Sequence, residues 1–219
     1  MKNLDNIVKI LKNIEVEHTI ALEYQRIDYL FCFCVGRFGD AATIEDKIFF
    51  KEIPRWIYNW IIENGYQVKF TLFWDRMIYS ITNNEEKAWM LCFKCIYECI
   101  DYLKKIIKNN KNEGEFNYKL NIKQRIRIIK NRPGVVGVTE KRIDYISHYF
   151  AGIYSKEDEN FNSKEFEQIT QYIYTYLVSK GYSIEKSKWW HKMIYQITTD
   201  EDESWELLFE VLIKYFEQK

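Results

Sequence analysis

The chain has 219 residues, enough for one large domain or for two domains of about 100 residues each. Aromatic residues make up 17% of the chain, which favours dense packing over disorder, and only eight glycines and two prolines occur, which favours long helices over a turn-rich β fold. The formal net charge is zero, so no bulk field draws the chain to nucleic acid or to a membrane.

The N-terminal stretch MKNLDNIVKILKNIE is amphipathic and mixed in charge. It lacks the unbroken apolar segment and the small-residue cleavage site of a signal peptide. No segment approaches the roughly 18 uncharged apolar residues of a membrane span. The sequence therefore predicts a cytoplasmic protein with reduced thiols and no membrane partner.

One apolar helical stripe begins near Arg26. Its members, at helical spacing, are Ile27, Leu30, Phe31, Cys34 and Val35. The next helical pattern contains Pro54, so we expect this helix to start at Pro54 or to kink there, and Gly65 marks its end. Two more helices follow, one with Trp74 and one with Trp89 on the apolar face. Asn84 is the expected N-cap of the second of them.

A polar connection, KNNKNEGEFNYK, follows the fourth helix. Within it, FNYKLNI alternates between polar and apolar residues and is compatible with a short strand. Beyond this connection the helical pattern resumes.

Two stretches of the chain are nearly alike: WDRMIYSITNNEEKAWMLCF from Trp74 and WHKMIYQITTDEDESWELLF from Trp190. They lie 116 residues apart, and the same shift matches the chain from Arg26 onward without a gap, with about twenty identical positions. A fixed offset is typical of duplicated structural units. We therefore expect an all-α fold, a tandem duplication of a roughly four-helix unit, with units at 1–106 and 122–219 and a linker at 107–121.

The five cysteines do not predict a metal site. Cys92, Cys95 and Cys99 share one helix face, but their matches in the second copy are Leu208, Val211 and Tyr215. Cysteines at such positions are typical of small core hydrophobes, with a metal or redox role as the alternative. We expect no metal and no cofactor.

Aspartate recurs in one polar pattern. Asp28 and Asp144 each follow Arg-Ile and precede Tyr, so both copies keep the arginine and the carboxylate. One interpretation is a structural salt bridge or a hydrogen bond at the helix start. The other is a polar site that is repeated in each half.

Charge is segregated along the chain. Between Lys104 and Arg132 there are ten Lys or Arg residues, which we call the basic strip. The second copy carries two acidic clusters, Glu157-Asp158-Glu159 and Asp200-Glu201-Asp202-Glu203. The basic strip could bind phosphates, and an acidic cluster could occupy the basic groove of a nuclease. The alternative is a solvated surface on which the two patches face each other.

The segment RIDYISH, from Arg142 to His148, resembles the Arg-x4–6-His motif of HEPN-type ribonucleases, which are also helical. The first copy keeps Arg26 but has Cys32 in place of the histidine. The resemblance implies a helical ribonuclease. A related hypothesis is an enzyme site between the halves, formed by Arg142, Tyr145, His148 and His191.

The size, the aromatic-rich helices and the acidic-then-Trp pattern of ITNNEEKAWMLCF and ITTDEDESWELLF make the chain similar to small all-α immunity proteins of bacterial toxin systems. A phage-encoded inhibitor of a host defence complex would have the same character. Either resemblance implies a protein partner, a toxin or effector and often a nuclease, that is bound and blocked.

We therefore expect a non-enzymatic binding protein without catalytic residues. Its partner-binding residues are expected to be Glu157, Asp158, Glu159, Glu201, Asp202 and Glu203. The alternatives are a nucleic-acid-binding protein that uses the basic strip at 104–132 and a HEPN-like ribonuclease. The sequence leaves the oligomeric state open.

Overall fold

The computed structural model describes residues 2–39, 44–107, 122–136, 140–155 and 163–218, and in these ranges it contains helices and no strand. The predicted helical class is confirmed. The proposed short strand falls almost wholly on residues outside the described ranges, and Ile122 begins a helix.

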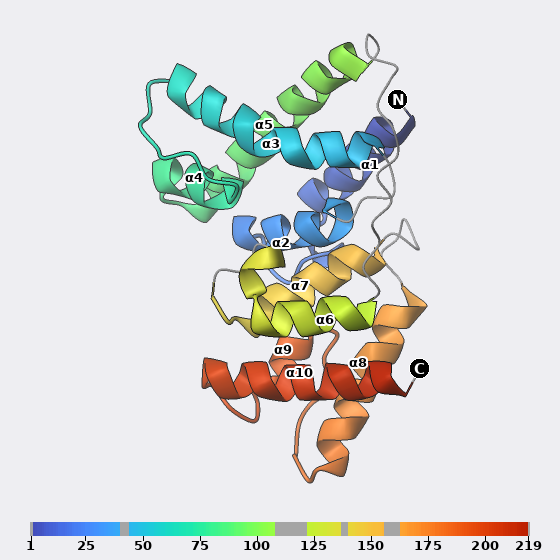
Figure 1. Ribbon diagram of the computed structural model, residues 1–219. Coiled ribbons are helices and arrows are strands. Elements are labelled where there is room, and N and C mark those ends of the chain that lie inside the picture. The colour runs from blue at the N-terminus through green and yellow to red at the C-terminus, as the bar shows by residue number, and fades with distance from the viewer. Residues whose placement is uncertain (1, 40–43, 108–121, 137–139, 156–162, 219) are drawn as a thin grey trace.

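Ten α-helices and two 3-10 helices occur in the described ranges (Figure 1). They are α1 Lys2–Val16, η1 His18–Ile20, α2 Ile27–Phe38, α3 Ile44–Glu63, α4 Trp74–Thr82, α5 Glu85–Ile107, α6 Ile122–Asn131, η2 Pro133–Val136, α7 Ile143–Tyr154, α8 Lys164–Ser179, α9 Trp190–Ile194 and α10 Glu201–Glu217. We call residues 2–107 the first half and residues 122–218 the second half. Each half contributes five α-helices, one more than the sequence indicated.

The additional helix of the first half is α1. Its amphipathic sequence buries Leu4, Ile7, Leu11 and Ile14 against the rest of the core. Helices at matched places begin 116 residues apart: α2 and α7, α4 and α9, and α5 and α10. The corresponding match of α1 with α6 is weak in sequence, so periodicity at the fixed offset did not reveal it.

Helix ends follow local chemistry. The side chain of Asn84 accepts a hydrogen bond from Lys87 N at 2.9 Å, as expected for an N-cap, and Asp200 accepts one from Glu203 N at 2.9 Å. After α3 and α8 the chain turns through Gly65 (φ +84°) and Gly181 (φ +90°), a conformation that glycine adopts without a Cβ clash.

Of the two expectations for Pro54, a helix start is wrong, and a kink stays a prediction. Helix α3 begins ten residues earlier, at Ile44, and runs through the proline. A proline inside a helix costs about 3 kcal/mol because it lacks an N–H and its ring crowds the preceding turn. Here the same helix buries Phe49, Ile53 and Ile57, and this burial offsets that cost.

The two halves meet along α2 and α7 at the centre of the molecule, with the first half above and the second half below in Figure 1. The two backbones come close at Gly36 and Gly152. A Cβ on Gly36 would lie 2.0 Å from the carbonyl oxygen of Tyr149, and one on Gly152 would lie 2.1 Å from that of Phe33. The contact is therefore reciprocal, as in a two-fold interface, and each half requires a glycine.

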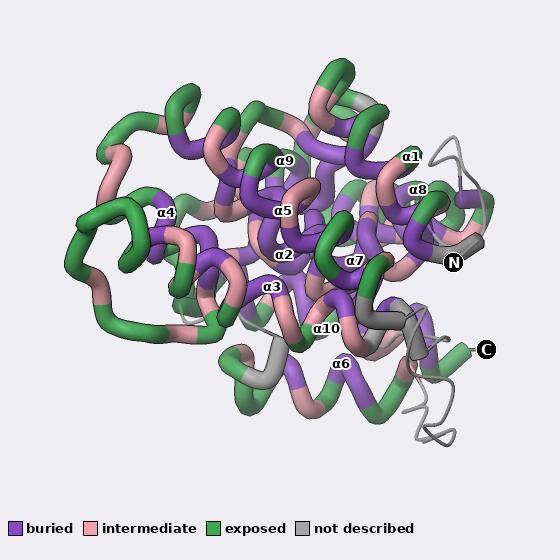
Figure 2. Tube along the Cα trace, turned by 90° about the horizontal axis from the view of Figure 1, so that it is seen from above, coloured by how far each residue is buried: buried purple, intermediate pink, exposed green. Residues whose placement is uncertain are grey.

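One hydrophobic cluster extends through both halves, and Figure 2 shows the buried residues concentrated around α2 and α7. All five cysteines are buried and free, which agrees with their interpretation as core residues. None of the helices in the described ranges combines the length and the apolar character that spanning a membrane requires.

Candidate functional site

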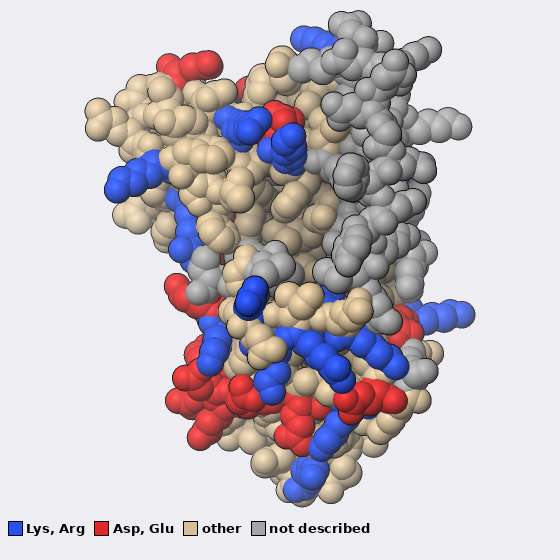
Figure 3. All heavy atoms as spheres, in the orientation of Figure 1, with Lys and Arg blue, Asp and Glu red and all other residues tan. Residues whose placement is uncertain are grey.

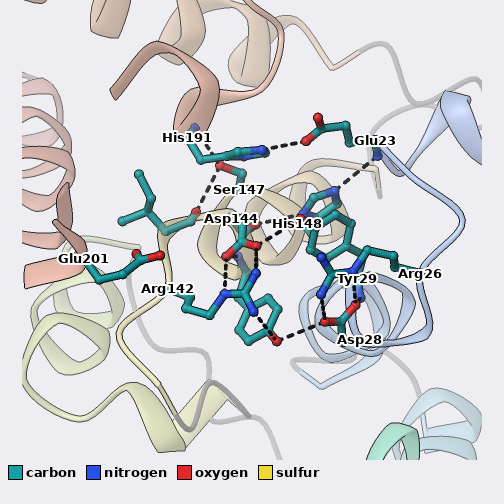
Figure 4. Close-up of polar contacts among 12 residues, drawn as sticks. Glu23, Arg26, Asp28, Tyr29, Arg142, Asp144, Ser147, His148, His191 and Glu201 are labelled. Carbon is teal, nitrogen blue, oxygen red and sulfur yellow. Dashed lines mark hydrogen bonds and ion pairs between the residues drawn. The ribbon is translucent and has the colours of Figure 1, made fainter. Parts of the chain in front are cut away.

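The N-terminal ends of α2 and α7 form a polar network at the junction of the halves (Figure 4). The Tyr29 hydroxyl donates to Asp144 Oδ2 at 3.0 Å, and the Tyr145 hydroxyl donates to Asp28 Oδ2 at 3.0 Å. Each half therefore supplies the phenol that binds the carboxylate of the other half. The two tyrosine rings meet edge to face with centroids 6.3 Å apart.

Each carboxylate also has an arginine partner from its own half. Arg26 forms an ion pair with Asp28, and Arg142 forms one with Asp144. Each guanidinium lies 4.5 Å from the ring centre of the tyrosine that follows its own aspartate. The salt-bridge interpretation of the repeated Arg-Ile-Asp-Tyr pattern is thus confirmed, and the reciprocal tyrosine contacts add a link between the halves.

The electrostatics keep the tyrosines as donors. Burial raises the pKa of Tyr29, and the facing carboxylate of Asp144 raises it further. Burial and the charge of Asp28 likewise raise the pKa of Tyr145. Both phenols therefore stay protonated at neutral pH, and both carboxylates accept hydrogen bonds inside a low-dielectric contact.

His148 is completely buried in this contact. Its Nδ1 lies 2.8 Å from the carbonyl oxygen of Asp144, to which it donates, and its Nε2 accepts from the backbone N–H of Glu23 at 3.2 Å. The ring stacks on Tyr29 at 3.9 Å and on Trp189 at 4.6 Å. Burial lowers the pKa of His148 to about 3, so the imidazole is neutral with both nitrogens in use.

A second histidine links the halves through an acidic partner. His191 Nε2 lies 2.6 Å from a carboxylate oxygen of Glu23, and Lys192 lies 2.6 Å from the other oxygen. Burial lowers the pKa of His191, so at neutral pH its Nε2–H donates to Glu23 as a neutral group. Although burial by itself would raise the pKa of Glu23, the hydrogen bond from Lys192 keeps it lowered. Ser147 accepts from the His191 backbone N–H at 3.3 Å.

The place that matches His191 in the first half is occupied by Asp75. This carboxyl is buried, and its Oδ1 has no hydrogen-bond partner among the described residues. Burial raises the pKa of Asp75 to about 7, and the negative charge of Asp28 contributes to the rise. The two halves therefore place unlike titratable groups at matched positions beside the same network.

The side chains of the network are engaged with one another and with the backbone. Arg142 is engaged by Asp144, Tyr145 by Asp28, and His148 by two backbone groups inside the core. A nuclease histidine of the Arg-x4–6-His type has to reach a substrate, and His148 has no solvent access. Within the described ranges, no group of three or more His, Cys, Asp or Glu side chains is placed to hold a metal ion.

A broad hollow lies elsewhere, beside the start of α8. It has a volume of about 860 Å³, and its lining combines the Phe166 ring with polar and charged side chains that include Gln171, Lys186 and Lys188. None of its lining residues within the described ranges is a histidine or a cysteine. The hollow is separate from the polar network.

The predicted partner-binding residues fall into two groups. Glu201, Asp202 and Glu203 are exposed in the first turn of α10. Asp202 pairs with Lys141 at 2.8 Å, Glu201 accepts from the Tyr195 hydroxyl at 2.9 Å, and Glu203 accepts from the Thr198 hydroxyl at 2.7 Å. Glu157, Asp158 and Glu159 lie outside the described residues.

The part of the basic strip on α6 lies beside the acidic residues of α10. Lys130 pairs with Glu206 at 2.7 Å and Arg127 with Glu217 at 3.3 Å. Figure 3 shows the Asp and Glu side chains as a band below the Lys and Arg side chains on this face. Glu206 and Glu217 lie outside the two acidic clusters and in the same half as α6, so the expected pairing of the strip with those clusters across the junction stays a prediction. Residues 108–121 of the strip lie outside the described ranges.

Sequence reasoning did not single out Glu23, Ser147 or Asp75. Glu23 precedes the region that repeats clearly, so the offset gave no signal. Ser147 matches Phe31, and a lone serine on an apolar face carries no pattern. One signal for a buried polar group was available in the sequence. Asp75 and His191 occupy matched positions, both are polar, and each directly follows a tryptophan that the two stretches share.

Comparison with known proteins adds no relative: the chain matches no protein-family model, no curated protein and no solved structure.

Proposed function

We propose that this protein is a non-enzymatic binding protein, an immunity protein or inhibitor that neutralises a toxin or effector by direct contact. The observation that carries the proposal is the exposed acidic cluster Glu201, Asp202 and Glu203 in the first turn of α10. Three neighbouring carboxylates on a rigid helix suit a basic partner surface, such as the substrate groove of a nuclease. The complex forms in the cytoplasm, with no cofactor.

The buried polar centre supports a structural role in place of a catalytic one. Its side chains are occupied in contacts between the halves, and His148 uses both ring nitrogens within the core. The polar groups that another molecule can reach are therefore those of the surface, including the exposed carboxylates of the first turn of α10. This favours recognition over chemistry.

We also propose that the chain arose by tandem duplication of one helical unit. The fixed offset of 116 residues supports this, as do the reciprocal glycine contacts of α2 and α7. Duplicated units share a core and can diverge on their surfaces, which builds a recognition face. The acidic turn is one such divergence, because Glu203 matches Lys87 in the first half.

The test is affinity purification of the tagged protein from its native host in about 0.5 M salt, where phosphate contacts of basic residues are strongly weakened. We expect one stoichiometric protein partner, identified by mass spectrometry. Asp202→Lys and Glu201→Lys should each weaken its binding at least tenfold. Glu86→Lys is the matched control, because Glu86 occupies the place of Asp202 in the first half.

Recovery of nucleic acid alone, removed by salt, would contradict the proposal and favour the basic strip at 104–132. Ribonuclease activity of the purified protein that disappears in His148→Ala, at an unchanged unfolding midpoint, would favour the HEPN-like alternative. Equal loss of binding in Asp202→Lys and Glu86→Lys would remove the acidic cluster of α10 as the contact.

A further inference from the structure

The loop between α3 and α4 exposes three large apolar side chains within seven residues. Tyr66 is 47% exposed, Phe70 48% and Leu72 67%. We call these three residues the loop patch. A single exposed apolar residue is ordinary on a protein surface, but a cluster of them is typical of a contact site.

The matched loop of the second half shows that the fold does not require this character. There, Tyr182, Lys186 and Lys188 take the places of Tyr66, Phe70 and Leu72. Lys186 donates to Gln171 Oε1 at 2.5 Å, and Lys188 lies over the Trp189 ring at 5.5 Å. The Phe70 ring meets that of Tyr58 edge to face, with centroids 5.4 Å apart, yet Phe70 stays about half exposed. Because two of the three positions accept lysine in the matched loop, the loop itself does not require apolar side chains there.

The exposed charges within the loop and the first turn of α4 are basic, and the exposed carboxylate of Glu63 precedes the loop. Between Asn64 and Asn84 the charged residues are Lys69, Asp75 and Arg76. Asp75 is buried, whereas both basic residues are exposed. A partner surface that fits here therefore combines an apolar pocket with flanking carboxylates.

The loop patch and the acidic turn of α10 are connected on one side of the molecule. Arg76 lies 3.9 Å from Glu140, and the next residue, Lys141, pairs with Asp202 at 2.8 Å. In Figure 3 the left edge changes from mostly uncharged residues at the top, through Lys and Arg, to Asp and Glu below. One partner could therefore touch both regions without a gap.

We infer that the loop patch is the apolar part of the surface that binds the toxin or effector, and that the acidic turn of α10 is its charged part. This inference rests on the proposed function. The occupant is a protein that places an apolar pocket with acidic flanks opposite Phe70 and Leu72 and basic groups opposite Glu201–Glu203. Apolar anchors supply much of the affinity of protein interfaces, whereas peripheral charges mainly set specificity and association rate.

The experiment grafts the second half's residues onto the first. Phe70→Lys with Leu72→Lys introduces the side chains found at the matched positions, so the unfolding midpoint should stay unchanged. Affinity for the stoichiometric partner obtained from the host should fall at least about tenfold. Val178→Lys, at an exposed apolar position of α8, is the control and should bind within twofold of the unaltered chain.

A second measurement keeps an aromatic group in place. With p-benzoylphenylalanine at position 70, ultraviolet light should crosslink the partner, and with the same group at position 182 it should not. Suppose that the unaltered chain holds a protein partner, that the lysine variant binds it equally well, and that position 70 does not crosslink it. The assignment of the loop patch to the interface is then overturned, while the proposed function stands. If the unaltered chain holds no protein partner, both are overturned.

Discussion

The second half satisfies its buried polar groups more completely than the first. Trp190 Nε1 donates to Thr170 Oγ1 at 2.8 Å, and Trp205 Nε1 donates to the Lys130 carbonyl at 3.2 Å. The matched indole nitrogens of Trp74 and Trp89 have no partner among the described residues. A buried donor without a partner costs about 1–3 kcal/mol. The two halves therefore have similar apolar cores but differ in how fully their buried indole N–H groups are hydrogen-bonded.

The cause can be traced to single positions. Pro54 stands where the second half has Thr170, so the acceptor for the tryptophan is missing from the first half. Likewise Asp75 stands where the second half has His191, whose Nε2 has Glu23 as its partner, although its Nδ1 has none among the described residues. The first half therefore carries more of the buried polar atoms that lack a hydrogen-bond partner. Three predictions test the comparison of the two halves.

The largest effect is expected at the two central glycines. Gly36→Ala and Gly152→Ala each place a methyl group about 2 Å from a backbone oxygen of the other helix, which neither backbone can avoid without separating the halves. We expect each to lower the free energy of unfolding by about 4 kcal/mol or more, measured by urea denaturation. Gly134→Ala, with open space around it, is the control. A loss of stability at only one of the two glycines would show that they contribute unequally to the free energy of unfolding.

An intermediate effect is expected at Asp75. Its pKa of about 7 lies above the ordinary 3.8, so the protonated form favours folding. This stability is complete below pH 3.8 and is lost as the pH rises through 7. Between pH 5 and pH 8 the free energy of unfolding should fall by about 2–3 kcal/mol relative to that of Asp75→Asn, which does not titrate. Parallel pH profiles of the two proteins would show that Asp75 titrates normally.

The smallest effect is expected at the reciprocal tyrosines. Tyr29→Phe removes the donor to Asp144, whose side chain is 4% exposed, whereas Tyr145→Phe removes the donor to Asp28, which is 18% exposed. Water can replace the lost donor more easily at the second site. We expect losses of about 2 and about 1 kcal/mol in thermal or urea unfolding. The reverse order would mean that exposure does not govern these bonds.

Several features of the fold could be predicted from the sequence because they depend on local pattern. The apolar stripes of α2 and α4, the caps at Asn84 and Asp200, and the turns at Gly65 and Gly181 all follow from spacing and turn chemistry. The local pattern could not decide between a helix that starts at Pro54 and one that passes through it, because burial of the rest of α3 outweighs the local cost of the proline.

The polar centre was only partly predictable. The repeated Arg-Ile-Asp-Tyr pattern indicated the ion pairs of Asp28 and Asp144, since arginine and aspartate are two residues apart. The contacts of Tyr29 and Tyr145 join residues more than 110 positions apart in the chain. No local pattern encodes such a contact. Glu23 beside His191 is a further example, because the two residues are 168 positions apart in the chain.

The reciprocal contact of α2 and α7 also bears on how the protein behaves on dilution. Two separate protomers that met through such a surface would come apart at low concentration, whereas here one polypeptide carries both sides of the contact. A covalent connection of this length acts like a local concentration in the millimolar range. The contact between α2 and α7 therefore persists when the protein is diluted.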